Sequence, residues 1–322
     1  MANPETRVMP GRGPEAAPAP ITVILNAAAG ARDKAAIGRR LAALFRDHGV
    51  AAEIHLIERG AEAAGWARRA VAAGTGVVVA GGGDGTVSSV AAVLAGTSVP
   101  LGVLPLGTFN YFARNLGIPL DLEDAVHTLV HGRVISVNLG ELNGRLFVNT
   151  SSLGLHSRIL TEAERYKARL GRRRWVAVVS GIRTVLQPHP LFSIRLGVGA
   201  TVTAYRTPLV FVGNNRLQAA QFDQRAGTCL DAGQLSLYVM HPVGRWGLLR
   251  LVLKALFRRA ADSPGLDLLC LQEGWIETPR RILSVSLDGE VVPMRSPLHY
   301  RVRPAALRVI VPAGEAGAVP PE

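Results

Sequence analysis

An apolar run that ends in a cluster of glycines constrains this chain more than any other feature. Residues 77–86 read VVVAGGGDGT, so a strand-like stretch leads directly into four glycines that enclose Asp84. After the glycines, Val87, Val90 and Leu94 recur at helical spacing. Glycine lets the backbone approach an anion closely, and the first N–H groups of a helix lack internal partners. A strand, a glycine turn and a helix start therefore predict a phosphate site.

Asp84 decides between two interpretations of this turn. A carboxylate repels bare phosphate, so its presence in an anion site favours an intervening cation, and Mg²⁺ is the usual one with nucleotides. The structural alternative is a tight β–α turn in which Asp84 is the helix N-cap. The run lacks the lysine of a G-x-x-x-x-G-K-[ST] loop and the third glycine of G-x-G-x-x-G, which disfavours both of those nucleotide sites.

Length and composition bound the answer further. With 322 residues, of which 48% are hydrophobic, the chain can form two moderate cores. No apolar run reaches the roughly 18 residues of a membrane span, and the nearest one is residues 175–186. Residues 1–20 lack the apolar segment of a secretory signal, and we expect a disordered tail there. Cys229 and Cys270 are the only cysteines, which predicts no disulfide framework and a reducing compartment.

The charge balance is basic, at +12. The basic residues cluster at residues 165–174, at residues 254–259 and at Arg280 and Arg281. Such fields attract anionic membranes or nucleic acid. The alternative is a generally arginine-rich composition in which solvated arginines carry no function. No helix-turn-helix or aromatic RNA-binding motif accompanies the charge, so we expect no nucleic-acid partner.

The first part of the chain alternates between strands and helices. Strands are predicted at residues 21–25, 51–57, 76–80 and 100–104, with helices at 34–48, 62–73 and after the glycine turn. This alternation is typical of a doubly wound parallel sheet covered by helices on both faces. Ligands of such sheets bind beyond the carboxyl ends of the strands. Asn26, Asp84 and Thr108 all follow strand ends, so we expect them to converge.

From about residue 134 the pattern changes to short strands separated by turn residues. They are predicted near residues 134–139, 145–150, 192–196, 208–213, 234–240, 266–271 and 282–287. Helical stretches near 156–186 and 244–259 interrupt them, and residues 298–302 and 307–311 are expected to form a closing hairpin. We therefore predict a tail at 1–20, an α/β domain at 21–133 with about 297–312, and an antiparallel β-rich domain at 134–296.

Two more motifs carry candidate chemistry. Residues 105–114 read PLGTFNYFAR, in which Thr108 and Asn110 suit either helix capping or hydrogen bonds to a nucleotide. Asp288, Gly289 and Glu290 follow a late apolar strand. A hairpin turn is the structural interpretation. The functional one makes Asp288 a general base, which requires a substrate hydroxyl within hydrogen-bond reach.

The ordered set of GGDGT (82–86), PLGTFNYFAR (105–114) and DGE (288–290) resembles the diacylglycerol kinase catalytic family, which includes bacterial lipid kinases and sphingosine kinases. Three other segments agree: GNN (213–215), LDAGQL (230–235) and FVNTSSLG (147–154). The resemblance spans about residues 20–312. It implies an N-terminal domain like those of NAD kinases and phosphofructokinases, followed by a β-sandwich, with ATP in the cleft between them.

The resemblance also implies roles for particular residues. The phosphates and Mg²⁺ would be held by Gly82, Gly83, Asp84, Gly85 and Thr86. The nucleotide region would be lined by Asn26, Gly107, Thr108 and Asn110. Asp84 and Asp231 would bind the metal, Asp288 would accept the proton of the lipid hydroxyl, and Glu290 would support the metal site.

The chain departs from the family pattern at several positions. Ser88 and Ser89 stand where Asn-Glu is usual, Ala27 follows Asn26 in place of proline, Ala232 replaces the second acid of Asp-Asp-Gly, and His156 stands where many members have aspartate. Each change could weaken metal binding. Because the three main motifs are intact, we expect an active enzyme.

The resulting prediction is an ATP- and Mg²⁺-dependent lipid kinase, with diacylglycerol as the default substrate and phosphatidic acid as its product. We expect it in the cytoplasm, held peripherally at the inner membrane surface by its basic clusters. The alternatives are a soluble NAD kinase-like enzyme and an inert lipid- or nucleotide-binding regulator. Oligomeric state stays open, with a homodimer among the options.

Overall fold

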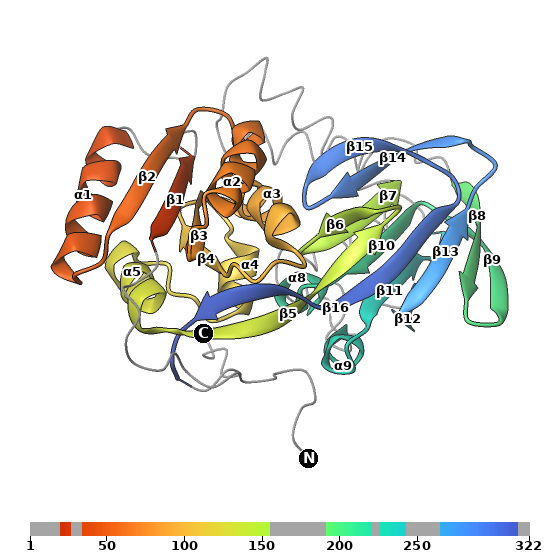
Figure 1. Ribbon diagram of the computed structural model, residues 1–322. Helices are drawn as coiled ribbons and strands as arrows, with labels where there is room; N and C mark the ends of the chain where they lie inside the picture. The colour runs from red at the N-terminus through yellow and green to blue at the C-terminus, as the bar shows by residue number, and fades with distance from the viewer. Residues whose placement is uncertain (1–19, 27–33, 155–190, 221–225, 243–264, 315–322) are drawn as a thin grey trace. The chain divides into compact units, whose positions relative to one another are not determined.

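The computed structural model describes residues 20–26, 34–154, 191–220, 226–242 and 265–314 (Figure 1). The chain divides into two compact units. The first unit comprises residues 1–139 and 303–322, and the second comprises residues 140–302. The chain passes between them in two strands, β5 (Arg133–Leu142) and β16 (Leu298–Val311). The expected boundary at residues 133/134 thus falls at the start of β5, and the division lies within that strand.

The first unit is a doubly wound α/β domain, as the alternation predicts. Its parallel strands lie in the order β2 (Ala52–Ile57), β1 (Ile21–Asn26), β3 (Val77–Gly82) and β4 (Leu101–Pro105). The C-terminal part of β16 adds a further parallel strand beside β4, with Val309 opposite Leu101. Strands β1 and β3 are buried almost throughout, because helices cover both faces of the sheet.

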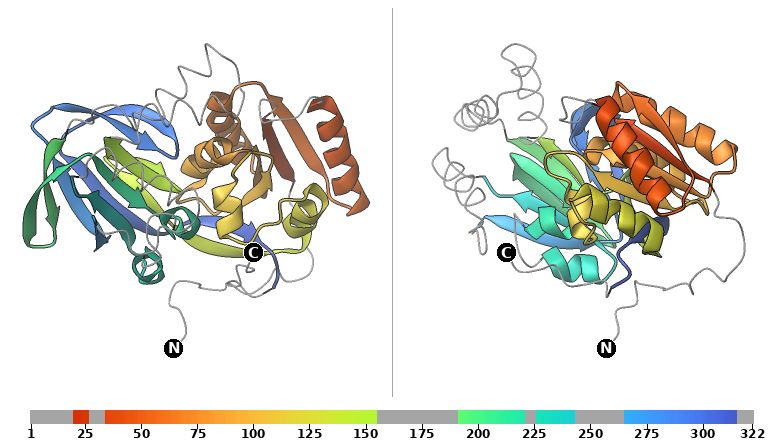
Figure 2. Two further views of the ribbon diagram at one scale, coloured as in Figure 1. Left: turned by 180° about the vertical axis from the view of Figure 1, so that it is seen from behind. Right: turned by 90° about the vertical axis from the view of Figure 1, so that its left-hand side faces the viewer.

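The helices of the first unit form two layers (Figure 2). On one face, α1 (Lys34–Asp47) and α5 (Leu122–His131) share an apolar cluster with the strands, in which Phe45 and Leu129 take part. Helices α2 (Ala63–Ala72) and α3 (Asp84–Leu94) pack together on the other face. The short helices are η1 (Gly60–Glu62) and α4 (Tyr111–Asn115).

The second unit is a β-sandwich, as the sequence resemblance implies. One sheet runs β12 (Leu266–Leu271), β11 (Leu235–Met240), β10 (Leu209–Gly213), β7 (Thr150–Gly154), β14 (Ile282–Leu287), β15 (Glu290–Arg295). The other contains β13 (Glu273–Glu277), β8 (Phe192–Val198) and β9 (Thr201–Thr207), with the start of β16 beside β13. Strand β6 (Arg145–Phe147) pairs with β5. Side chains from both sheets meet in one apolar core, for example Val212, Val285, Ile276 and Tyr300.

Two short helices, α8 (Arg216–Ala220) and α9 (Ala226–Asp231), pack together on the second unit. Cys229 of α9 is joined to Cys270 of β12 by a disulfide. The sequence-based prediction of no disulfide was therefore wrong. Spacing gave no signal for it, because strand pairing and helix packing place the two cysteines together from 41 residues apart.

The predicted C-terminal hairpin is also wrong. Residues 298–311 form the single long strand β16, and the backbone at Ala305 has φ of 49° without reversing the chain. The expected helices near 156–186 and 244–259 and the expected N-terminal tail lie outside the described residues, apart from Pro20. Among the described residues, no helix is long and apolar enough to cross a membrane.

Candidate functional site

The glycine turn of the first unit lies between the end of β3 and the start of α3. Gly83 is the N-cap of α3 and offers no side-chain cap, so the first turn of the helix begins with bare backbone. Asp84 is the first helical residue, so the alternative interpretation of Asp84 as the helix N-cap does not hold. A Cβ on Gly82 would lie 2.6 Å from the Thr86 hydroxyl, so this position requires glycine. The N-terminus of α3 has the geometry and the partial positive charge of an anion site.

The second glycine motif packs directly against the first. The backbone N–H of Leu106 donates to the carbonyl oxygen of Gly82 at 3.0 Å. A Cβ on Gly107 would lie 2.4 Å from the Cα of Gly83, a separation that no side chain tolerates. The turns after β3 and β4 are therefore in main-chain contact. The structure confirms that the two turns come together beyond the carboxyl ends of neighbouring strands.

Asn26 and Thr86 join the end of β1 to the same place. The side-chain amide of Asn26 donates to the Thr86 hydroxyl at 2.9 Å. Thr86 is buried at 3% exposure, whereas Gly85 beside it is exposed. Asn26 thus lies beside the glycine turn, where the carboxyl ends of β1 and β3 are neighbours.

Asp84 connects the two motifs electrostatically. Its Oδ1 accepts a hydrogen bond from the backbone N–H of Phe112 in α4 at 3.1 Å. The carboxylate is half-buried and therefore lies between the first turn of α3 and the PLGTFNYFAR segment. An oxygen donor at the mouth of an anion site is the kind of ligand that Mg²⁺ prefers.

Asn110 organises the second turn and does not cap α4. It occupies the N-cap position in left-handed conformation, with φ of 51°, and makes no side-chain cap bond. Its amide group instead donates to the carbonyl oxygens of Pro105 and Gly107, and its Oδ1 accepts from the Gly107 N–H at 2.9 Å. The capping interpretation was wrong for Asn110. Thr108, which follows Gly107 in the chain, is exposed, so its side chain is available to a ligand.

Asp288 lies in the second unit, at a hairpin. Asp288 and Gly289 form the two-residue turn between β14 and β15, with φ of 47° and 89°. Both positive values match the turn type that favours Asp-Gly. The hairpin interpretation is confirmed. The side chain of Asp288 also accepts hydrogen bonds from another part of the second unit.

The Asp288 carboxylate binds the chain that leads into β7. Its Oδ2 accepts from the Val148 N–H at 2.8 Å, and its Oδ1 accepts from the N–H groups of Asn149 and Thr150 at 2.8 and 2.9 Å. Three N–H donors stabilise the ionised form of a carboxylate. The Asp288 side chain is therefore fixed in position, which the sequence did not predict.

The GNN segment clamps the same piece of chain. The Asn214 amide donates to the carbonyl oxygen of Val148 at 3.0 Å, and the Asn215 amide donates to Oδ1 of Asn149 at 2.7 Å. Three of the quoted motifs, FVNTSSLG, GNN and DGE, therefore meet at residues 148–150. Sequence reasoning named these motifs but not their meeting point, because it depends on β10 and β14 flanking β7.

The other predicted acids are Asp231 and Glu290. Asp231, at the end of α9, pairs with the guanidinium of Arg216. Glu290 is exposed at the start of β15. Over the described ranges, no group of three His, Cys, Asp or Glu side chains is arranged to hold a metal ion. A metal role for Asp84 or Asp231 stays a prediction, as do the catalytic roles of Asp288 and Glu290.

Several predicted features cannot be placed, because their residues are not among those that the structure describes. The basic segments at 165–174 and 254–259, together with Ala27 and His156, lie outside the described residues. Arg280 and Arg281 are described and are exposed on the second unit. Ser89, which stands where the family usually has glutamate, donates from its hydroxyl to the Gly85 carbonyl oxygen at 2.8 Å.

The fold and the two motif clusters define a class: an α/β unit with a glycine turn, joined to a β-sandwich that carries a fixed carboxylate. The model of the diacylglycerol kinase catalytic domain matches residues 20–142. A "Probable lipid kinase YegS" of Escherichia fergusonii is 30% identical over 280 residues, which cover 84% of this chain and 89% of that protein. The chain belongs to this family of lipid kinases.

Other relatives match over a shorter stretch. A "Probable lipid kinase YegS-like" of Cronobacter sakazakii is 39% identical over 134 residues, 40% of this chain and 45% of that protein, so this alignment spans less than half of the relative. Among solved structures, a diacylglycerol kinase of Bacillus anthracis has a TM-score of 0.64 at 19% identity, covering 90% of this chain and 96% of that one. Another Bacillus anthracis structure reaches a TM-score of 0.69 at 21% identity over the same shares of the two chains. These structural matches establish the fold.

Proposed function

We propose that this protein transfers the γ-phosphate of ATP to the hydroxyl of a membrane lipid, with diacylglycerol as acceptor and phosphatidic acid as product. The observation that carries the proposal is the contact between the two glycine turns beside Asp84, in a chain that belongs to a lipid kinase family. Phosphoryl transfer needs positioning and charge neutralisation more than covalent work by the protein. The backbone at the start of α3 supplies both for the triphosphate.

The residues of the first unit fit a metal–nucleotide ligand. The bare N-cap at Gly83 and the exposed Gly85 leave room for phosphate oxygens close to the backbone. Asp84 supplies the oxygen ligand for Mg²⁺, which would neutralise the phosphate charge when bound. Thr108 would contact the nucleotide, while Asn26, Gly107 and Asn110 hold the turns in shape.

Asp288 is the proposed acceptor of the hydroxyl proton. In this step the lipid oxygen bonds to the γ-phosphorus, the bond from phosphorus to the β,γ-bridging oxygen breaks, and the hydroxyl proton passes to the carboxylate. Three backbone N–H groups hold this carboxylate in place. The reaction requires the second unit to present Asp288 to the phosphate that the first unit holds.

The acceptor lipid resides in a bilayer, so we also propose that the protein works peripherally at an anionic membrane surface. The exposed arginines Arg280 and Arg281 on the second unit support this, since each basic residue near such a surface contributes about 1 kcal/mol. Binding to anionic and to neutral vesicles, compared for wild type and the double change of Arg280 and Arg281 to Gln, tests it. Equal binding in all four cases contradicts the proposal.

The deciding experiment measures transfer of labelled γ-phosphate from ATP to lipids in mixed micelles. Diacylglycerol, sphingosine, other lipid alcohols and NAD are supplied separately. We expect label in phosphatidic acid, and we expect Asp84→Asn and Asp288→Asn to reduce it strongly while the fold persists. Label on sphingosine alone would show that the acceptor is sphingosine and not diacylglycerol. Label on NAD alone would favour the NAD kinase alternative. No transfer to any acceptor by a folded protein that binds ATP would favour the inert regulator.

A further inference from the structure

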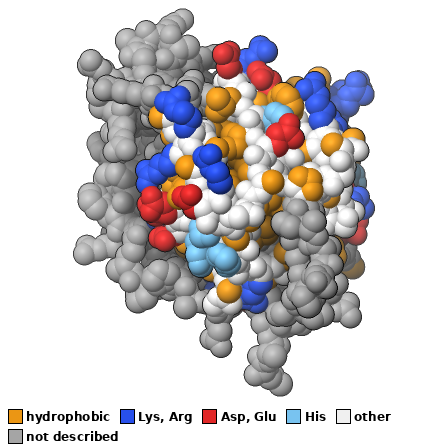
Figure 3. All heavy atoms as spheres, turned by 60° about the vertical axis from the view of Figure 1, so that its left-hand side comes forward, with side chains coloured by type: hydrophobic (Ala, Val, Ile, Leu, Met, Phe, Trp, Pro, Cys, Tyr) orange, Lys and Arg blue, Asp and Glu red, His pale blue; other side chains and the backbone are white. Residues whose placement is uncertain are grey.

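Three histidines meet on the surface of the first unit. His48 directly follows α1, and His127 and His131 lie one helical turn apart on α5. The ring centres of His48 are 6.0 Å from His127 and 5.3 Å from His131, and those of His127 and His131 are 4.6 Å apart. All three side chains are exposed. Figure 3 shows a patch of histidine side chains on this face.

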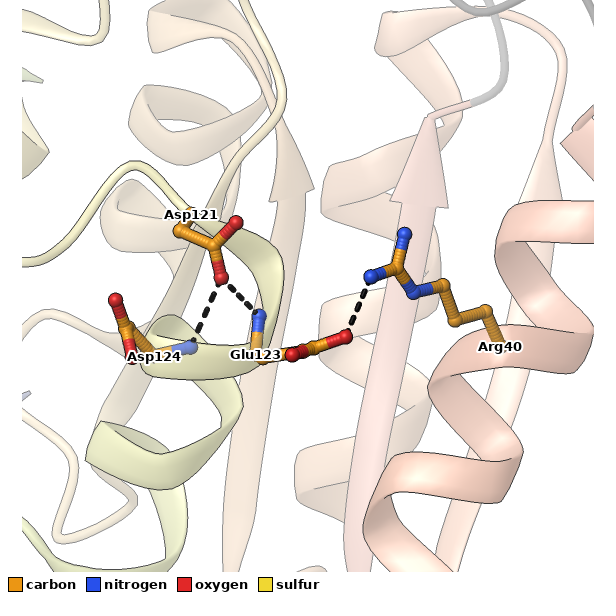
Figure 4. A network of polar contacts seen from close by, with 4 residues as sticks. All are labelled: Arg40, Asp121, Glu123 and Asp124. Atoms are coloured by element: carbon orange, nitrogen blue, oxygen red, sulfur yellow. Dashed lines mark hydrogen bonds and ion pairs between the residues drawn. The ribbon is translucent and has the colours of Figure 1, made fainter.

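The two helices hold the cluster on a fixed frame. Arg40 of α1 pairs with Glu123 of α5 at 2.5 Å (Figure 4). Eight residues further along the chain from Arg40 and from Glu123, His48 Nδ1 and His131 Nε2 approach to 3.4 Å. The helices therefore run parallel, with two contacts about 12 Å apart along their axes. Beneath them, Phe45 of α1 lies in the apolar cluster that also contains residues of α5.

We propose that His48, His127 and His131 form a binding site for a transition-metal cation, with Zn²⁺ as the best fit. A tetrahedral zinc with Zn–N bonds of about 2.0–2.1 Å places two ligand nitrogens about 3.4 Å apart and two ring centres about 5 Å apart. The measured separation of His48 Nδ1 and His131 Nε2 matches the first value. Imidazole nitrogens suit zinc, copper and nickel, whereas magnesium and calcium take oxygen ligands.

The third ligand has to turn into place. In the described part of the chain no three donor atoms already converge as a metal site. His127 is exposed and lies four residues before His131 on α5, a spacing that puts both rings on one helix face. The proposed site therefore requires His127 to change its side-chain rotamer so that three ring nitrogens converge. Water would take the fourth position of a tetrahedral ion.

The helix ends favour a cation at this place. His131 is the last residue of α5, and His48 is the first residue after α1. The carbonyl groups at a helix C-terminus carry partial negative charge, which attracts cations. Two parallel helices that end side by side add their effects at the same point.

This site is separate from the proposed nucleotide site. The chain leaves α1 at His48 and enters β2 at Ala52, so the helix ends at the edge where the parallel strands begin. The glycine turns lie where β3 and β4 end, at the opposite edge of the sheet. A metal at the histidines would link α1 to α5 and would not contact phosphate there. The proposal is independent of the kinase activity.

The test is calorimetric titration with Zn²⁺ alone, on protein stripped of metal with a chelator. The buffer holds excess Mg²⁺, which occupies carboxylate sites but competes poorly for imidazoles. We expect one Zn²⁺ per chain, and a loss of at least about tenfold in affinity in both His127→Ala and His131→Ala. His299→Ala, which removes an exposed histidine elsewhere, serves as the matched control and should bind as wild type does.

A second readout identifies the ligands. Co²⁺ in place of Zn²⁺ gives the visible absorption of a tetrahedral site, which the triple change of His48, His127 and His131 to Ala should abolish. The three side chains are exposed, so the variants should fold, and thermal melting without metal checks this. The proposal is overturned if folded triple-variant protein binds as much zinc as wild type, or if only His299→Ala lowers the affinity.

Discussion

The two units treat backbone N–H groups in opposite ways. In the first unit, the N-cap residue Gly83 of α3 makes no side-chain cap bond, which is the geometry of a helix start that binds an external anion. In the second unit, the N–H groups of residues 148–150 are bound by the internal anion Asp288. In the proposed function the first unit receives a charged ligand, and the second unit fixes a carboxylate. A phosphotransferase needs both parts.

The second unit is held together by long-range contacts, and we predict that its disulfide contributes strongly to its stability. The disulfide between Cys229 and Cys270 closes a loop with a sequence separation of 41. The chain-entropy estimate for such a loop is about 4 kcal/mol. We expect Cys229→Ala with Cys270→Ala to lower the free energy of unfolding by about that amount, measured with urea under oxidising conditions. Equal stability of wild type and double variant would show that the cysteines do not pair.

Asp288 provides the sharpest test within the second unit. Replacing it by alanine leaves three backbone N–H groups without their acceptor, and we expect a loss of about 3 kcal/mol in unfolding free energy. Asp84→Ala removes one such bond in the first unit and should cost about 1 kcal/mol. Urea unfolding of both variants measures the difference. If the two substitutions lower the free energy of unfolding equally, Asp288 is not more firmly bound by backbone N–H groups than Asp84 is.

The glycine turns allow a matched pair of substitutions. Gly107→Ala forces its Cβ against the Cα of Gly83, and we expect a loss of about 2 kcal/mol in stability together with weakened ATP binding. Gly85→Ala meets no atom within 4 Å and should leave stability nearly unchanged. Thermal melting and nucleotide titration measure the two effects. Tolerance of alanine at Gly107 would contradict the main-chain contact between the turns.

The smallest expected effect concerns α5 and pH. The backbone N–H groups of Asp124 and Glu123 donate to Asp121, the N-cap, and lower the pKa of its carboxyl (Figure 4). A lowered folded-state pKa adds stability above the ordinary aspartate value, which disappears as pH falls through the lowered pKa. Asp121→Asn keeps a capping acceptor but loses this dependence. The melting temperatures of wild type and variant should therefore converge as the pH falls below the ordinary aspartate pKa; a constant difference would contradict the shift.

Local signals predicted much of this molecule. The period of the apolar residues and the glycine turns gave the α/β unit, since each β–α step is encoded within a few residues. The Asp-Gly pair likewise gave the hairpin at Asp288. What the sequence could not give depends on partners far away: the bonds of Asp288 to residues 148–150, the pairing of Cys229 with Cys270, and Arg216 on Asp231. The capping interpretation of Asn110 failed because its backbone is left-handed and its amide donates to the carbonyl oxygen of Pro105.

The most direct test of the central claim is a crystal structure of the protein with Mg²⁺ and a non-hydrolysable ATP analogue. We predict that the γ-phosphate lies on the backbone at the start of α3, that the metal binds Asp84, and that the Asp288 carboxylate faces the same phosphate. A triphosphate bound elsewhere, or an Asp288 that does not face it when a lipid alcohol is also bound, would contradict the account.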